Sequence, residues 1–175
     1  MTDTFDDCLA CNLASGRIPL PGGLIHETGT WRVEHCVGPL GLGTLIVKPA
    51  RHVTAVADLS GQEASELGPL LVRASGIVRE LTGADQVYNC LWSHAGGIPV
   101  HLHYVIQGAT KEQTERFGAV GPGLQMAMFT NGTTPGAEEI EETATAARRL
   151  FAAQCPSIEP AGIPGPATAI PVSSA

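Results

Sequence analysis

Apolar and polar positions follow two different periods along this chain. Five short runs are rich in β-branched and other apolar residues and are bounded by glycine, proline or polar turns, a pattern that predicts β-strands. These runs are residues 24–27, 31–36, 44–48, 87–93 and 100–107. Between the third and fourth runs, apolar residues recur every three or four positions up to Leu81, after the capping-box residues Ser60 and Glu63. This spacing predicts a long amphipathic helix.

Further helices are expected on both sides of this central region, at residues 8–14, 122–129 and 137–153. Together the elements predict an α+β fold, with a five-stranded antiparallel sheet and flanking helices packed on one side of it. The 175 residues suit one domain. We expect that domain to span residues 1–155, with its core at 8–107 and a helical extension at 110–154. Residues 156–175 are rich in proline, alanine and serine, which predicts a flexible tail.

Composition narrows the class of protein. Apolar residues make up 43% of the chain, enough for a hydrophobic core, and the formal net charge is −7 with only ten lysines and arginines. This charge argues against a nucleic-acid-binding surface. Neither a long apolar span nor a basic, apolar leader is visible, so we expect a cytoplasmic protein without a membrane partner. The odd count of five cysteines, without an exported context, argues against a disulfide framework.

Cysteine and histidine residues form the pattern that suggests chemistry. Cys8 and Cys11 make a CxxC pair, which is a common zinc half-site. His101 and His103 alternate along one strand, so both side chains face the same side of the sheet. Zinc takes four nitrogen or sulfur ligands, and His52 with either His101 or His103 would complete the set. The alternatives are a redox CxxC pair and histidines that only line a polar groove.

These motifs, in their order and spacing, resemble the histidine-triad (HIT) superfamily of nucleotide hydrolases and transferases. The resemblance rests on the CxxC pair, the segment GTLIVKPARHV and the segment AGGIPVHLH, and covers roughly residues 8–107. It implies that His103 is the nucleophile, which attacks the α-phosphorus of a nucleotide. It also implies a bound Zn²⁺ ion and a homodimer. The implied zinc ligands are Cys8, Cys11, His52 and His101.

The sequence departs from the family pattern where phosphate is handled. Val105 stands in place of the third histidine, and Gln107 and His94 are our candidates to replace it in catalysis. Pro99 has no N–H to offer a phosphate. The predicted substrate-binding residues are Gly96, Gly97 and Asn89. A second alignment puts Pro99 at the first histidine position and makes His101 the nucleophile, but it breaks the spacing to the preceding glycines.

The resemblance therefore predicts a zinc-containing nucleotidyl hydrolase or transferase that cleaves a nucleoside phosphoramidate or a (di)nucleoside polyphosphate. One alternative is a nucleotide-binding HIT-like protein with reduced catalysis, which the missing third histidine suggests. Another is a repurposed zinc-dependent enzyme that acts on a small molecule other than a nucleotide. This last alternative needs an open position on the metal ion.

Overall fold

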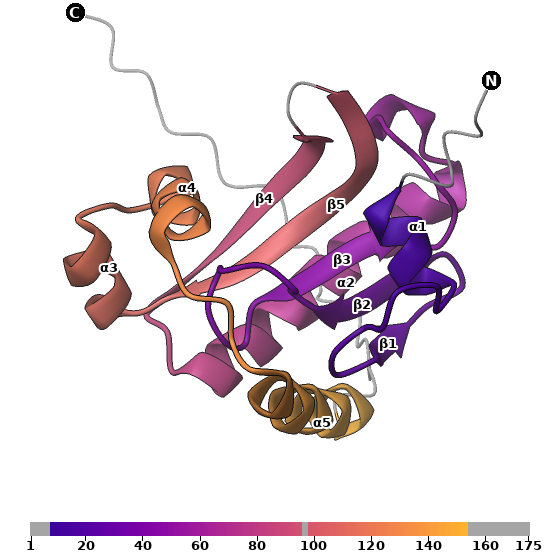
Figure 1. Cartoon of the computed structure of the whole chain (residues 1–175). Helices are drawn as coiled ribbons and strands as arrows, with labels where there is room; N and C mark the ends of the chain where they lie inside the picture. Colours follow the sequence, from indigo (N-terminus) through magenta and orange to yellow (C-terminus); the bar gives the residue numbers. More distant parts are fainter. Residues whose placement is uncertain (1–7, 96–97, 154–175) are drawn as a thin grey trace, which may run out of the picture.

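A single antiparallel sheet forms the centre of the computed structural model, which describes residues 8–95 and 98–153 (Figure 1). Its five strands lie in the order β1-β2-β3-β5-β4, and this confirms the predicted sheet. The strands are β1 (Leu24–Glu27), β2 (Trp31–His35), β3 (Leu45–Pro49), β4 (Gln86–Ala95) and β5 (Ile98–Ala109). Strand β5 therefore lies between β3 and β4, with neighbours on both edges.

The helices follow the predicted positions closely. They are α1 (Leu9–Ala14), the short 3-10 helix η1 (Val56–Asp58), α2 (Gly61–Thr82), α3 (Lys111–Phe117), α4 (Pro122–Asn131) and α5 (Ala137–Ala153). Both hydrogen bonds of the predicted capping box are present at the start of α2. Helix α3 was not predicted, although Thr110 and Gln113 form a capping box at its start. That signal was readable in the sequence.

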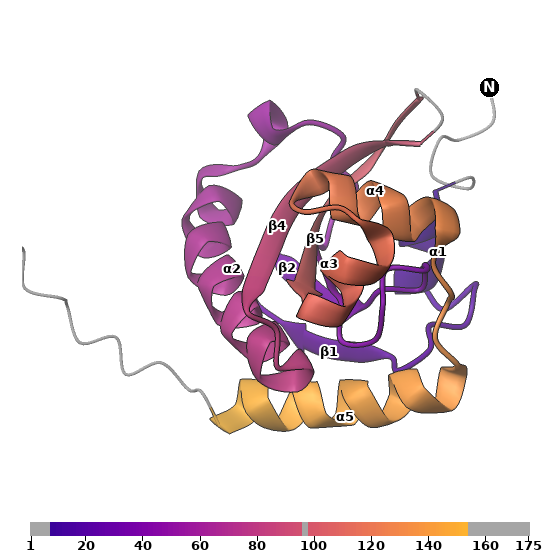
Figure 2. The same cartoon turned by 90° about the vertical axis from the view of Figure 1, so that its left-hand side faces the viewer.

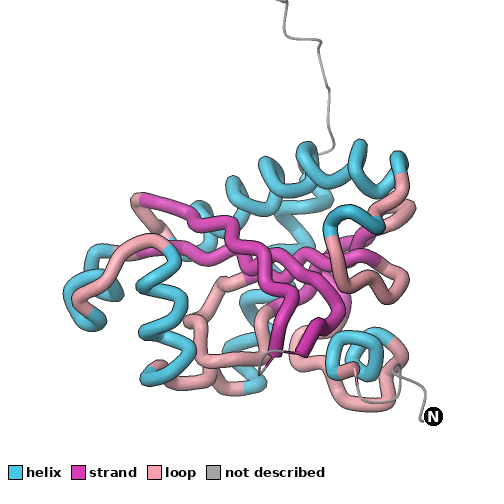
Figure 3. Tube along the Cα trace, turned by 90° about the horizontal axis from the view of Figure 1, so that it is seen from above, coloured by secondary structure: helices cyan, strands magenta, loops and turns pink. Residues whose placement is uncertain are grey.

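Helices cover both faces of the sheet, which corrects the expectation that they pack on one side. Helices α2 and α5 lie against one face, and α1 and α4 lie on the other (Figures 2 and 3). The one-sided expectation failed because α4 carries its own buried residues, Leu124 and Met128, which pack against Val105 of β5. We call the two sides of the sheet the α2 face and the α1 face.

Side-chain alternation assigns each strand residue to one of these faces. Trp31, Val33 and Val47 belong to the large apolar core on the α2 face. Their neighbours in sequence, including Glu34 and Lys48, are buried on the α1 face. The sheet therefore buries residues on both sides, and the larger apolar core lies on the α2 face.

The register of β5 places the predicted site residues. His103 lies opposite Trp92 of β4, and Val105 lies opposite Ile46 of β3. The predicted tail, residues 156–175, is outside the described residues, as are Gly96 and Gly97. Within the described part of the chain, no helix is long and apolar enough to cross a membrane.

Candidate metal centre and the neighbouring histidine

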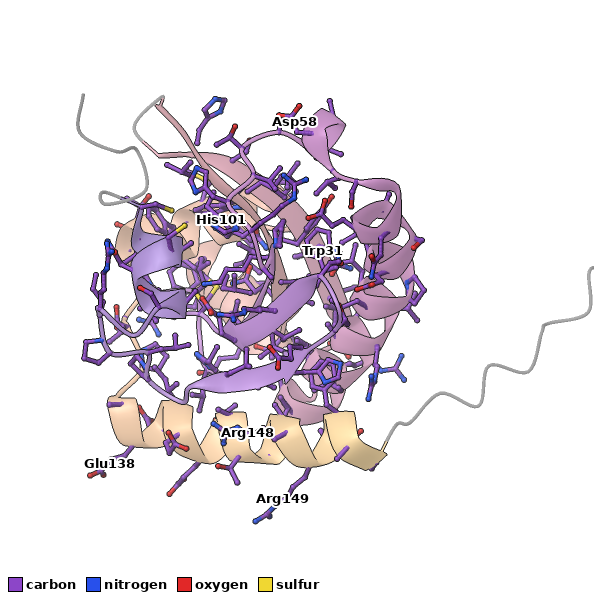
Figure 4. All side chains as sticks on the ribbon, turned by 90° about the vertical axis from the view of Figure 1, so that its right-hand side faces the viewer. Trp31, Asp58, His101, Glu138, Arg148 and Arg149 are labelled. Atoms are coloured by element: carbon purple, nitrogen blue, oxygen red, sulfur yellow. The ribbon has the colours of Figure 1, made fainter. Side chains whose placement is uncertain are left out.

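Four side chains from three distant segments converge beside α1. The ligand atoms of Cys8, Cys11, His52 and His101 all lie within 4.8 Å of one another. Figure 4 shows His101 next to α1, with yellow sulfur atoms close to it. The structure thus brings together all four residues of the predicted zinc set.

Local structure explains why these residues meet. Cys8 is the N-cap of α1 and Cys11 lies in its first turn, so the two sulfur atoms fall on the same side of the helix. Strand β3 ends at Pro49, and His52 follows three residues later. The N–H of Leu102 donates to the carbonyl of Val53 at 2.7 Å, which holds the segment after His52 against β5 beside His101.

Two hydrogen bonds of His101 suit it to hold a metal ion. Its Nε2 lies 3.0 Å from the carbonyl oxygen of Pro49, and because a carbonyl only accepts, Nε2 carries the proton. The other ring nitrogen, Nδ1, then has a free lone pair and lies 3.5 Å from the Cys11 sulfur. Burial is the main cause that lowers the pKa of His101 to about 4, so the ring is neutral near pH 7. A neutral ring oriented by a backbone carbonyl is typical of a metal ligand.

The spacing and chemistry of the set fit Zn²⁺. The Nδ1 atom of His52 lies 3.3 Å from the Cys11 sulfur. With Zn–S bonds of about 2.3 Å and Zn–N bonds of about 2.0–2.1 Å, a tetrahedral ion separates its sulfur and nitrogen ligands by about 3.5 Å. Burial raises the pKa of the Cys11 thiol to about 11. The hydrogen bond with Cys8 and the charge of Cys8 act in the same direction. A bound cation is therefore what would make this sulfur a thiolate near neutral pH.

His103 lies two residues further along β5, on the same face. Its Nδ1 lies 3.0 Å from the carbonyl oxygen of His101, so Nδ1–H donates and the lone pair is on Nε2. Burial, with a smaller effect of Lys48, lowers the pKa of His103 and so favours the neutral ring near pH 7. The rings of His103 and Trp92 are 6.4 Å apart. The strand thus presents one imidazole oriented for a metal ion and a second with an unprotonated nitrogen.

Helix α4 covers Val105 and Gln107, the side chains that follow His103 on the same face of β5. Val105 is 1% exposed and Gln107 has no exposed surface. The amide nitrogen of Gln107 donates to the carbonyl of Leu40 at 2.9 Å and lies 3.0 Å from the Met128 sulfur. Gln107 therefore shares a face with His103 but cannot touch a substrate bound there in this arrangement.

Helix α4 is held over these two side chains by Trp92. The indole Nε1–H of Trp92 donates to Oε1 of Gln125 at 3.2 Å, and its ring packs edge to face against Phe129 at 5.2 Å. Sequence reasoning missed this contact, because nothing in the two local sequences indicates that they meet.

The remaining predicted residues are not gathered at one place. His94 is exposed near the end of β4. Asn89 does not join the site, because its amide exchanges hydrogen bonds with the Ser75 hydroxyl of α2 and so lies on the α2 face. Asn89 pairs with Ile106 of β5, which is also a core residue on the α2 face. Gly96 and Gly97 lie outside the described residues.

A buried ion pair beside the candidate metal centre was also missed. Lys48 Nζ lies 2.6 Å from Oε1 of Glu34, and both side chains are almost fully buried. Burial raises the pKa of Glu34, and Lys48 opposes that shift. The readable signal was a lysine inside an otherwise apolar strand.

Comparison with known proteins supports the fold. No known family profile and no curated protein matches the sequence. Among solved structures, a HIT-like protein involved in cell-cycle regulation from Bartonella henselae superposes with a TM-score of 0.63 at 16% identity, covering 83% of this chain and 96% of that one. A hypothetical histidine triad nucleotide-binding protein from Sulfolobus tokodaii gives a TM-score of 0.64 at 17% identity, covering 84% and 93%.

A Zn-bound histidine triad family protein from Mycobacterium smegmatis superposes with a TM-score of 0.61 at 17% identity, covering 85% of this chain and 96% of that one. These likenesses span nearly the whole length of each matched chain. The chain therefore has the histidine-triad fold, as its motifs predicted, and it combines that fold with a four-residue cluster that could hold a metal ion.

Proposed function

We propose that this protein is a zinc-containing HIT-like nucleotidyl hydrolase or transferase, with His103 as its nucleophile. The observation that carries the proposal is the hydrogen bond from His103 Nδ1–H to the His101 carbonyl, which leaves Nε2 unprotonated. Two of the matched structures are described as a nucleotide-binding protein and a Zn-bound protein, which supports the substrate class and the metal.

The reaction divides into two displacements at phosphorus. The Nε2 lone pair of His103 forms a bond to the α-phosphorus of a nucleoside phosphoramidate or (di)nucleoside polyphosphate. The bond from phosphorus to the leaving group breaks, and the leaving group departs with the electron pair and a proton from solvent. Water, or an acceptor hydroxyl in a transferase, then attacks phosphorus, releases Nε2 and loses a proton. A neutral imidazole near pH 7 is a suitable nucleophile for this sequence.

The metal ion would stabilise the site rather than react. Cys8, Cys11, His52 and His101 would fill a tetrahedral shell, and the bound ion would supply rigidity to the strand that carries His103. Four protein ligands leave no open position for a substrate, which argues against the repurposed enzyme that uses zinc as a Lewis acid.

His94 and Gln107 are the two further catalytic candidates of the sequence. His94 is exposed, whereas Gln107 is buried, so we propose a catalytic role for His94 alone. We expect His94→Ala to lower kcat for substrates with poor leaving groups more than for substrates with good ones. An equal effect on both classes would remove His94 from leaving-group chemistry.

The experiment that tests the proposal is replacement of His103 by alanine, with turnover assayed on nucleoside phosphoramidates and dinucleoside polyphosphates. We expect turnover to be lost in His103→Ala and kept in the control His26→Gln, because His26 stacks on Phe151 on the α2 face. Rapid quenching of the wild type followed by mass spectrometry should find a nucleotidyl group on His103. Unchanged turnover in His103→Ala would reject the nucleophile.

A nucleotide-binding protein with reduced catalysis is the second candidate. The burial of Val105 and Gln107 favours it, because the row beyond His103 then offers no exposed polar group to a transition state. Calorimetry would support this candidate if nucleotides bind tightly while no member of the substrate panel is cleaved. The predicted homodimer is a separate proposal that sedimentation of the purified protein would test.

A further inference from the structure

Helix α1, which carries both cysteines, has little apolar contact with the rest of the protein. It is six residues long, Leu13 is its only buried residue, and Leu9 is 55% exposed. A single buried leucine is a weak constraint on a short helix, because most helical stability in proteins comes from the packing of an apolar face. Something else must fix the position of the two sulfur atoms.

Two cations on neighbouring strands bind the backbone of this helix. Lys48 of β3 donates from Nζ to the carbonyl of Ala10 at 3.0 Å. Arg32 of β2 donates from Nη1 to the carbonyl of Ala14 at 3.2 Å. Lys48 and Arg32 are direct cross-strand partners. The pair therefore holds α1 at two points, and Ala10 lies inside the Cys8–Cys11 turn itself.

Glu34 makes this arrangement possible at a buried position. It accepts from Lys48 at 2.6 Å, and the side chains of Lys48 and Glu34 are 1% and 5% exposed. A buried ion pair is commonly less stable than a well-packed apolar pair of similar volume. Its presence here is explained if the Lys48 ammonium is needed for the Ala10 carbonyl, which no apolar side chain could bind.

We propose that Lys48, with its counterion Glu34 and its neighbour Arg32, is a positioning residue that sets the metal affinity of the Cys8–Cys11 turn. The inference rests on the metal centre of the proposed function and adds to it the group that orders two of the four ligands. Lys48 also links the metal centre to the strand that carries His103. Val47 pairs with Tyr104 in an antiparallel ladder, so the next residues along the two strands, Lys48 and His103, lie beside each other.

The experiment measures zinc affinity by competition with a chromophoric chelator, together with the melting temperature of each zinc-free protein. The informative variant replaces both partners, Lys48→Met with Glu34→Leu, so that no charge is left buried alone. We expect this double variant to melt at or above the wild-type temperature. We expect it to bind zinc about 10–100-fold more weakly, the loss typical of groups that orient metal ligands.

Lys111→Met with Glu115→Leu is the matched control. Lys111 forms an exposed ion pair with Glu115 at 3.7 Å on α3, so this control removes the same two charges and the same kind of contact away from α1. Its zinc affinity should equal that of the wild type.

The cobalt-substituted wild type should show the strong visible bands of a tetrahedral thiolate site. The variant with Lys48→Met and Glu34→Leu should show weakened or shifted bands.

Different failures have different meanings. If the wild type binds no zinc, the metal centre of the proposed function fails. If the wild type binds zinc and the double variant binds it equally well, the positioning role of Lys48 is overturned alone. Should the double variant not fold, Arg32→Met tests the same arrangement, because Arg32 is only partly buried. It should bind zinc more weakly than the wild type, and an unchanged affinity would overturn the proposal.

Discussion

The two faces of the sheet differ in how many polar side chains their strands bury. The α2 face is an apolar core shared by the sheet, α2 and α5, in which Trp31, Val33 and Val47 have no exposed surface. On the α1 face the buried strand residues include Glu34, Lys48 and His101. These polar groups are held by hydrogen bonds and an ion pair rather than by close apolar packing.

Because the two faces differ, residues that stabilise the fold and residues that form the candidate site alternate along the same strands. Because side chains alternate, each strand of the sheet contributes one set of residues to the core and another to the site. On β5, Leu102 and Ile106 are core residues of the α2 face, while His101 and His103 face α1. Substitutions on the α2 face should therefore change folding stability, and those on the α1 face should change metal binding and catalysis.

The largest expected effect comes from Trp31→Ala on the α2 face. The Trp31 ring is fully buried, and its indole nitrogen donates to the Glu63 carbonyl at 2.9 Å. We expect the free energy of unfolding to fall by about 3–5 kcal/mol, measured by urea unfolding. The control Val72→Ala changes a residue that is 76% exposed on α2, and should stay within about 0.5 kcal/mol. If Trp31→Ala folds but no longer binds zinc, the expectation that the α2 face affects only stability is wrong.

Metal removal is the next test, on the α1 face. Zinc that binds only the folded state should stabilise the protein by about 2.7–4 kcal/mol when free zinc is 100–1,000 times Kd. A chelator should remove this contribution in the wild type and have no effect on Cys11→Ser. Identical unfolding curves for the wild type with and without chelator would mean that the four-residue cluster does not hold an ion.

The sequence predicted the strands, the long helix and the four residues of the candidate metal centre well for physical reasons. Alternation and the capping box are local signals, so the strand at 24–27 has the predicted bounds and the helix after Ser60 ends within one residue of the predicted Leu81. The four candidate metal ligands could be found because a CxxC pair and histidines are chemically distinctive wherever they stand in a chain. The β4–β5 hairpin is longer than predicted, because ladder pairing extends it beyond the apolar runs into residues such as Gly108.

What the sequence could not predict depends on contacts between distant segments. Trp92 meets Gln125 across 33 positions, and Gln107 meets Leu40 across 67 positions. These contacts are the reason that Val105 and Gln107, beyond His103 on β5, are buried. Gln107 looked available for catalysis because alternation gives the face of a strand residue but not what covers that face.

Val105→His sharpens the comparison, because it restores the residue type that the family pattern expects. Val105 is 1% exposed and packs among Leu124, Met128 and Cys36. A larger polar ring there should cost about 1–3 kcal/mol through overpacking and an unpaired nitrogen, measured by urea unfolding. Val105→Ala is the control for lost packing alone. We expect no gain in turnover. A rise in kcat would show that α4 can move away from β5 and that position 105 is part of the catalytic site.

The smallest expected effect is at Glu63, which links α2 to the loop that carries His52. Its carboxylate accepts from Arg51 at 2.7 and 2.8 Å and from the Ser60 N–H at 2.6 Å. The hydrogen bond from Arg51 is the main cause that lowers its pKa to about 2. Glu63→Gln can keep the capping hydrogen bond, as Gln113 does at the start of α3, but it loses the charge that Arg51 binds. This loss should cost about 1 kcal/mol at pH 7.

The pH dependence of that loss has a defined sign. Because the folded-state pKa is depressed, the carboxylate stabilises the fold above its ordinary pKa of 4.5, and this contribution is lost as pH falls towards about 2. The difference in unfolding free energy between wild type and Glu63→Gln should therefore shrink from pH 5 to pH 2. Glu80→Gln, an exposed change on the same helix, should stay within about 0.5 kcal/mol. A difference for Glu63→Gln that is constant with pH would mean that the Arg51 contact does not stabilise the ionised carboxylate.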